Sequence, residues 1–379
     1  MNNLVRTNCV ICNNTIKNIH KLDKFPIKLL ETNISTNKYL FEELSFSICT
    51  SCNTIQLDKL VPLEELYNTS HNTEIVGNTW LKYYDLFKSI INLYIEDKNI
   101  LEVGCPSGKI AKLCNNFNKW YIVDINKHLD VKKNNIFFIQ DFFENNFLLN
   151  DNIDIIIHSH LFEHIYEPNI FLRKCYKILP NNGKMIFGIP NMEHMVDKTL
   201  FMGVFFEHNI FYNCNNISYL LKKNGFNIIN INYYEKHSII IECIKTVPNT
   251  NITNDNNFKL QNYLPNFTKL INLYKNFINI CNLIIGNNIP NKKFIFGASY
   301  NTQFLLFNGL NYELLDNILD NSLDKQNKYF YGTKLKILNP TILENLENPI
   351  IILNNGYYSN EICLQLYEIN NSIIFIKYK

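Results

Sequence analysis

The stretch NILEVGCPSGKIAKLC, residues 99–114, decides the fold of this chain. Its apolar start predicts a strand that ends at Glu102, and a helix is expected to begin near Lys109. Between them, a turn runs from Gly104 to Gly108. Glycine lets the backbone approach a ligand closely, and the first N–H groups of a helix can bind an anionic group. The stretch therefore predicts a ligand-binding unit within an α/β fold.

Two further strand ends support a cofactor site at this edge of the sheet. The strand in KWYIVDIN, residues 119–126, ends at Asp124, whose carboxylate can accept hydrogen bonds from both hydroxyls of a ribose. The strand NIFFIQ is followed by Asp141 and Phe142, an acid and an aromatic that can hold the edge and the face of an adenine. The glycine spacing is not GxGxxG, which disfavours the alternative of an ordinary nicotinamide-binding fold.

The chain is expected to contain three domains. Residues 1–62 hold two Cys-x-x-Cys pairs, and residues 63–245 alternate apolar strands with amphipathic segments, as in a parallel sheet with crossover helices. The polar stretch TVPNTNITNDNN, residues 246–257, is predicted to be a linker. A second, shorter alternation follows, beginning with KKFIFG, so residues 246–379 are predicted to form a smaller Rossmann-like domain.

Composition excludes several classes of protein. The 379 residues are 46% hydrophobic and 18% charged with a net charge of +2, which argues against disorder and against non-specific binding of nucleic acid or anionic membrane. Without a membrane-spanning run or an export signal, a soluble cytoplasmic protein is expected, in the host cytoplasm if it is viral. The abundant asparagine is typical of an AT-rich genome. The sequence does not indicate an oligomeric state.

The paired cysteines predict a structural zinc site. Cys9 and Cys12 form one Cys-x-x-Cys pair, and Cys49 and Cys52 form the other. Each pair can present two thiolates from one turn, and four thiolates complete a tetrahedral Zn²⁺ site that leaves no position open for a water. Free thiols or a redox pair are the alternatives, but two pairs are much harder to obtain by chance than one.

These motifs resemble class I S-adenosylmethionine-dependent methyltransferases, and further strands continue the resemblance in DIIIHSHLFEHIYEPNIFL (154–172) and KMIFGIPN (184–191). More narrowly, the whole chain is similar to C-methyltransferases of nucleotide-linked deoxysugars, which combine a zinc-binding domain, a methyltransferase core and a C-terminal Rossmann-like domain. The C-terminal part carries that likeness in FGASYNTQFLL (296–306) and ILNNGYY (352–358). Pro106 and His160 depart from the family, which more often has Asn at both positions. The cofactor-binding residues implied are Glu102, Gly104, Gly108, Asp124, Asp141, Phe142 and His160.

The resemblance also implies a catalytic base. In FFEHNIFYN, residues 205–213, Glu207 and His208 look like the family's Glu-His pair, in which the histidine removes a proton. Tyr67 is the best match to a tyrosine-rich segment over the substrate, and His71 is a rival base. Glu163-His164 is expected to have a capping or packing role.

The expected activity is methyl transfer from S-adenosylmethionine to a nucleotide-linked keto- or amino-deoxysugar by base-assisted SN2 displacement. Three alternatives stay open: an O- or N-methyltransferase of a nucleotide sugar or glycan sugar, a silent zinc and Rossmann binding scaffold, and an RNA methyltransferase. The last is disfavoured because no basic cluster accompanies the cysteines.

Overall fold

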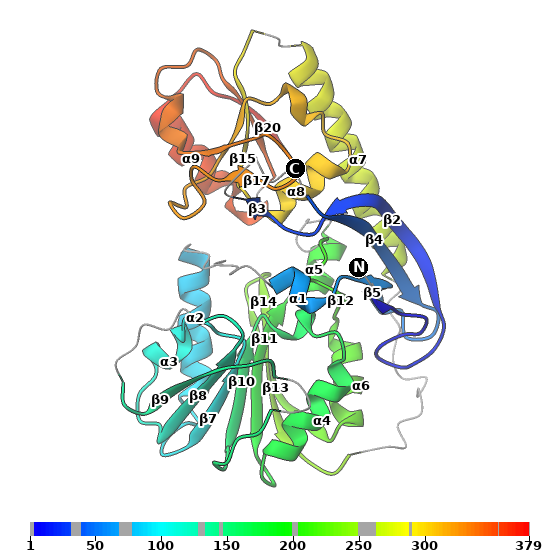
Figure 1. Cartoon of the computed structure of the whole chain (residues 1–379), viewed down its shortest axis with the longest axis vertical. Helices are drawn as coiled ribbons and strands as arrows, with labels where there is room; N and C mark the ends of the chain where they lie inside the picture. Colours follow the sequence, from blue (N-terminus) through cyan, green and yellow to red (C-terminus); the bar gives the residue numbers. More distant parts are fainter. Residues whose placement is uncertain are drawn as a thin grey trace.

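The computed structural model describes residues 4–31, 39–67, 78–127, 133–143, 147–198, 204–248, 263–287, 290–354 and 356–378. Figure 1 shows a large sheet with its helices at the bottom, a second α/β layer at the top, and a long N-terminal hairpin beside both. No helix within these residues is long and apolar enough to cross a bilayer.

The large sheet has seven strands, and its strand order reverses once. The order along the sheet is β13-β14-β11-β10-β7-β8-β9. All neighbours from β11 to β9 are parallel, whereas β14 runs antiparallel to both β11 and β13. The strands are β7 (Asn99–Val103), β8 (Lys119–Asp124), β9 (Ile136–Gln140), β10 (Ile155–Ser159), β11 (Lys184–Pro190), β13 (Phe226–Tyr234) and β14 (Ser238–Lys245). The order reverses between β7 and β10, and ligands of open α/β sheets bind beyond the carboxyl ends of such a strand pair.

Helices cover both faces of this sheet because alternate residues of the buried strands are apolar on both sides. Ile100 packs on the face covered by α2 (Asn78–Ile91) and α3 (Lys109–Leu113). Leu101 packs on the opposite face with residues of α4 (Pro168–Ile178) and α6 (Cys214–Lys223). The predicted α/β class and the strand–turn–helix unit at residues 99–114 are confirmed.

The N-terminal part is mainly antiparallel. The hairpin pairs β2 (Ile16–Pro26) with β4 (Phe41–Cys49), β5 (Ile55–Leu57) adds to β4, and β12 (Ile210–Phe211) from the central part adds to β5. Short strands β1 (Leu4–Val5) and β6 (Lys59–Leu60) pair beside them, and α1 (Leu63–Tyr67) follows. Along the chain, β12 lies between β11 and β13 of the large sheet. Its pairing with β5 therefore connects the N-terminal part to the central part.

The C-terminal part contains a second, wholly parallel sheet of five strands in the order β18-β16-β15-β19-β20. It follows the long helix α7 (Leu264–Asn287). Its other elements are β15 (Lys293–Phe296), α8 (Tyr300–Phe307), β16 (Asn317–Leu319), β18 (Ile337–Leu338), β19 (Ile350–Leu353), α9 (Ser359–Ile369) and β20 (Ile374–Lys377). The strand KKFIFG expected from the sequence is β15. Most of the expected linker, from residue 249 onward, lies outside the described residues.

One hydrophobic core joins the N- and C-terminal parts. It includes Phe25 and Phe46 of the hairpin, Tyr274 of α7 and Ile295 of β15. A second antiparallel pair, β3 (Leu30–Glu31) with β17 (Tyr329–Phe330), adds backbone hydrogen bonds between the two parts. The domain boundaries at residues 62 and 245 stay predictions.

Candidate functional site

The turn after β7 lies beside the loop that follows β10. Gly104 and Gly108 have φ values of +75° and +61°, which favour glycine. A Cβ atom on Gly104 would lie 2.7 Å from Cδ1 of Leu161, which follows β10. The turn therefore packs tightly against the loop after β10, and both positions depend on glycine.

Glu102 supports this turn from inside the core. Its side chain is 2% exposed, and Oε2 accepts a hydrogen bond of 2.8 Å from Nε1 of Trp120. Burial raises the pKa of Glu102 to about 7, although its hydrogen bonds with Cys105 and Trp120 oppose the shift. The carboxyl group thus faces Trp120 and Cys105, so it contributes to the predicted cofactor site by positioning the turn.

Replacement of Glu102 by Gln is expected to flatten the dependence of stability on pH. A carboxyl group whose pKa is raised in the folded state stabilises the fold below its unfolded pKa, and this contribution is lost as the pH rises through about 7. The wild type should therefore lose about 2 kcal/mol more unfolding free energy than Glu102→Gln between about pH 5.5 and about pH 8. Urea denaturation at both pH values measures this difference. The exposed Glu344→Gln variant should behave like the wild type, and equal losses in all three proteins would contradict the assignment.

The predicted ribose and adenine residues follow β8 and β9. Asp124 is the last residue of β8, and its Oδ1 accepts a 2.8 Å hydrogen bond from the backbone N–H of Asn126. The backbone N–H of Asp141 donates to the carbonyl oxygen of Asp124 over 3.2 Å. Asp141 is exposed and Phe142 is half-buried. The structure therefore brings these residues to the same edge of the sheet as the turn at Gly104.

His160 follows β10 and has an unusual environment for a cofactor contact. Its φ is +50°, and its Nε2 lies 3.0 Å from Oγ of Ser238. The ring packs edge-on against Trp80 and Tyr83 at centroid distances of 4.8 and 5.2 Å. Burial lowers the pKa of His160 to about 3, so the imidazole is neutral at pH 7.

A second cluster gathers side chains that are far apart in the sequence. Tyr67 ends α1, and its hydroxyl lies 3.2 Å from Nδ1 of His164. The same Nδ1 lies 3.8 Å from Oε2 of Glu207, and the rings of His164 and His208 are 5.0 Å apart. Tyr300, the first residue of α8, donates a hydrogen bond to Oε1 of Glu207. Side chains from the predicted central and C-terminal domains thus meet in one cluster.

Burial sets the protonation states in this cluster. It lowers the pKa of His208 well below the usual value, and the neighbouring His164 and His160 add to the shift. His208 is therefore neutral at pH 7, and its Nδ1 has no hydrogen-bond partner within the described part of the chain. Burial, with the charge of Glu207, raises the pKa of Tyr67 and of Tyr300 well above the usual value. Both tyrosines consequently stay protonated and can donate hydrogen bonds.

Glu163 completes the cluster, and of the two roles expected for Glu163-His164, capping is not observed, whereas the burial of Glu163 agrees with packing. No side chain caps the short 3₁₀ helix Phe162–His164, in which Glu163 lies. The carboxyl group of Glu163 is 1% exposed, and its oxygens accept no hydrogen bond from the described residues. His160 and His164 approach Oε1 to 3.5 and 3.8 Å. Burial raises the pKa of Glu163 to about 7, so this group can exchange a proton near neutral pH.

Three members of the cluster were not predicted as site residues from the sequence, namely Glu163, His164 and Tyr300. The Glu163-His164 motif precedes Glu207-His208 by 44 positions, and only the fold brings the two pairs together. Tyr300 follows the turn after β15. The strand–turn–helix pattern there could have indicated Tyr300 as a candidate site residue. The rival base His71 lies outside the described residues.

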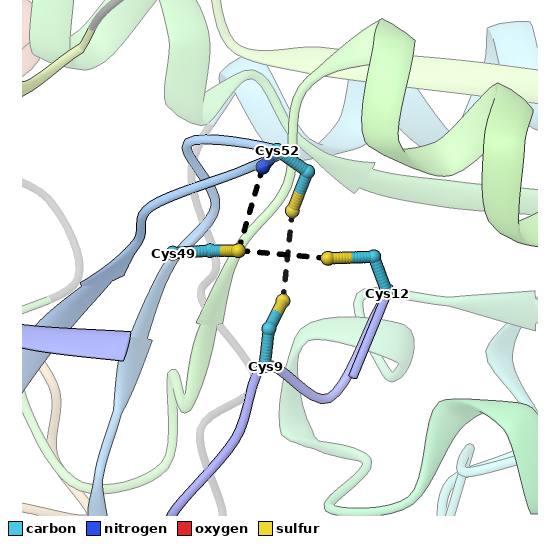
Figure 2. Close-up of side chains that lie close together, drawn as sticks. All are labelled: Cys9, Cys12, Cys49 and Cys52. Atoms are coloured by element: carbon cyan, nitrogen blue, oxygen red, sulfur yellow. Dashed lines mark hydrogen bonds between the residues drawn. The ribbon is translucent and has the colours of Figure 1, made fainter. Parts of the chain in front are cut away.

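The four N-terminal cysteines form a compact cluster (Figure 2). Their Sγ atoms lie within 4.8 Å of one another, with 3.5 Å between Cys9 and Cys52 and 3.5 Å between Cys12 and Cys49. A tetrahedral Zn²⁺ site with Zn–S bonds of about 2.3 Å separates its sulfur atoms by about 3.8 Å. The four side chains point at a common centre, so the donor set and its geometry fit one Zn²⁺ ion.

The central part of the chain matches a known protein family. Residues 82–231 match a family described as methyltransferase domain. This range runs from within α2 into β13, so it includes the turn at Gly104, Asp124 and the Glu207-His208 pair. No curated protein sequence matches the chain.

Several solved structures match slightly less than half of the chain. The N-methyltransferase NodS from Bradyrhizobium japonicum, in complex with S-adenosyl-L-homocysteine, has 12% identity and a TM-score of 0.36, covering 48% of this chain and 95% of NodS. A SAM dependent methyltransferase from Aquifex aeolicus has 18% identity and a TM-score of 0.34, covering 44% of this chain and 88% of that one.

Proposed function

We propose that this chain is a class I S-adenosylmethionine-dependent methyltransferase that methylates a nucleotide-linked keto- or amino-deoxysugar, and the match of residues 82–231 to a methyltransferase domain supports the reaction. The observation that carries the proposal is the meeting of Tyr67 and Glu207-His208, from the predicted central domain, with Tyr300 from the predicted C-terminal domain. Substrates often bind where two domains meet. The resemblance of the whole chain to sugar C-methyltransferases supports the same substrate class.

The cofactor site is assigned to the carboxyl ends of β7, β8 and β9. The turn from Gly104 to Gly108 would receive the methionine part, Asp124 the ribose, and Asp141 with Phe142 the adenine. Asp124 is close enough to Tyr67 to contribute to that residue's raised pKa, which supports one continuous site for cofactor and acceptor. His160, whose ring packs on Trp80, would shape the wall between them.

Replacement of Asp124 by Ala is expected to weaken binding of S-adenosylhomocysteine about 10- to 100-fold. A hydrogen bond to a charged group contributes about 1.5–3 kcal/mol, and each 1.4 kcal/mol changes affinity tenfold. Calorimetric titration measures the change, and the thermal unfolding temperature checks that the fold is retained. Asp85→Ala, at an exposed position of α2, is the matched control and should bind like the wild type. Unaltered affinity in Asp124→Ala would exclude the ribose role.

His208 is assigned as the general base. S-adenosylmethionine, when bound, supplies an electrophilic methyl group. The neutral imidazole of His208 takes the proton from the carbon next to the keto group of the sugar. Tyr67 remains protonated, and its hydroxyl group can donate to the oxygen on which negative charge develops, whereas Tyr300 donates to Glu207. S-adenosylmethionine, held at the turn from Gly104 to Gly108 and by Asp124, would supply the methyl group that this carbon accepts.

The cysteine cluster is proposed to hold a structural Zn²⁺ ion. All four positions of a tetrahedral site would be filled by thiolates, which leaves no open position for catalysis. The ion would fix the two turns at Cys9–Cys12 and Cys49–Cys52 against each other. The N-terminal part would then depend on metal for its stability.

The test of the substrate class is a methyl-transfer assay with nucleotide-linked 4-keto sugars and a labelled methyl donor. A product with one added methyl on carbon, together with donor-independent exchange of the neighbouring proton in D₂O, is expected. Methylation of oxygen or nitrogen without proton exchange would replace the proposal with the O- or N-methyltransferase alternative. No transfer to any nucleotide sugar would reject this substrate class.

A further inference from the structure

The two acid–histidine pairs of the proposed active site lie on separate turns, residues 163–166 and 207–209. Side chains of one turn contact side chains of the other, as in the 3.8 Å distance from Nδ1 of His164 to Oε2 of Glu207. The relative position of the turns therefore determines the geometry of the cluster. Two buried residues outside the cluster, Arg6 and Asn209, connect the turns.

Asn209 links the turns directly. Its side chain is fully buried, and Nδ2 donates a 2.8 Å hydrogen bond to the carbonyl oxygen of Glu163. Its backbone N–H lies 3.1 Å from the same oxygen. The residue that follows His208 thus holds the backbone of Glu163 through two donors.

Arg6 binds both turns from the N-terminal part. Its Nη2 donates to Oδ1 of Asn209 over 2.7 Å and to the carbonyl oxygen of Tyr166 over 2.5 Å. Its Nη1 lies 3.3 Å from the carbonyl oxygens of Asn209 and Leu57. The side chain is 8% exposed, and all four of these acceptors are uncharged. A guanidinium offers several donors in a rigid plane, so it can satisfy this fixed set of oxygens where a lysine could not.

The elements that carry these contacts begin or end at the cysteine cluster. Arg6 precedes Cys9 by three positions, and β5 begins three positions after Cys52. Leu57 of β5 donates its backbone N–H to the carbonyl oxygen of Asn209 over 2.9 Å. Gln56 joins the two segments, because Oε1 accepts from the backbone of Val10 and Nε2 donates to the carbonyl oxygen of Asn8.

We infer that the cysteine-cluster module positions the active site, with Arg6 and Asn209 as the positioning residues that fix the Glu163-His164 turn against the Glu207-His208 turn. This inference rests on the proposed function for its kinetic consequence, but the structural linkage does not. The module therefore has a role beyond stabilising its own fold. Arg6 and Asn209 need not touch the substrate for this role.

The test compares Arg6→Ala with Arg173→Ala, which removes an exposed arginine of α4. Arg6→Ala is expected to lower kcat about 10- to 100-fold, because misplacement by about 1 Å can cost that much in rate. Its affinity for S-adenosylhomocysteine should stay within about twofold of the wild type. Arg6→Lys keeps the charge without the planar fork, so its kcat should lie closer to that of Arg6→Ala than to that of the wild type. The Arg6→Lys variant also provides the test if Arg6→Ala does not fold.

A second readout does not depend on methyl transfer. In protein labelled with ¹⁵N-histidine, the ring signals of His164 and His208, assigned with His164→Gln and His208→Asn, should shift in both Arg6 variants and not in Arg173→Ala. Unshifted signals, or wild-type kcat in a folded Arg6 variant, would overturn the inference. If the wild type transfers no methyl group, the proposed function fails, while shifted ring signals would still support the linkage.

Discussion

Replacement of His208 by Asn is expected to lower kcat for methyl transfer by about 10²- to 10⁴-fold, the usual contribution of a general base. Affinity for S-adenosylhomocysteine should stay within about twofold, because His208 is assigned to the acceptor and not to the cofactor. The physical reason lies in the environment of the ring. Its Nδ1 has no hydrogen-bond partner among the described residues, so this nitrogen is available to accept a proton.

The design separates loss of the base from loss of the fold. His194→Asn, at a histidine of α5 (Met192–Asp197) outside the cluster, is the control and should retain wild-type turnover. Proton exchange at the sugar carbon in D₂O, measured without methyl donor, should disappear in His208→Asn alone. If turnover and exchange both persist, His208 is not the base, and His164 becomes the residue to test because it contacts Tyr67 and Glu207.

Replacement of Cys49 by Ser is expected to release the metal and to destabilise the N-terminal part. Cys49 is fully buried, and its Sγ lies 3.5 Å from that of Cys12. Structural Zn²⁺ contributes on the order of 10 kcal/mol of apparent folding free energy in small zinc-binding peptides, so the loss of one of four ligands should have a large effect. Wild-type protein should contain about one Zn²⁺ per chain by atomic emission, and Cys49→Ser should contain little.

A buried cysteine outside the cluster provides the control for this experiment. Cys363 of α9 is 4% exposed, and Cys363→Ser should keep the zinc and lose only about 1–3 kcal/mol from burying a hydroxyl. Zinc content that is the same in the wild type and Cys49→Ser would contradict a four-thiolate site. A metal-free wild type that unfolds at the same temperature with and without added Zn²⁺ would contradict a structural role.

Structural features that are formed by neighbouring residues could be predicted from the sequence. The strand, the turn and the helix at residues 99–114 follow from apolar periodicity and glycine placement, and Asp124 was expected at a strand end, where it lies. Such features depend on neighbouring residues alone. The two Cys-x-x-Cys pairs likewise indicated a common centre, and the structure brings their sulfur atoms together.

The contacts across the fold could not be predicted. Tyr300 meets Glu207 over 93 positions, and Arg6 meets Asn209 over 203 positions. Neither pair has a sequence pattern of its own, because its partners are brought together by the packing of separate parts of the chain. The contacts of Glu163 could not be predicted for a related reason. Its position in a short helix was compatible with capping or packing, and only the fold directs the side chain inward toward His160 and His164.

Calorimetric titration of the zinc-loaded protein with S-adenosylhomocysteine tests for the cofactor site on which every proposed step depends. We expect one-to-one binding with a Kd in the micromolar range or tighter, despite Pro106 in the turn and His160 beside Trp80. Absence of binding in well-folded protein would contradict the assignment of a methyltransferase and would favour a binding scaffold.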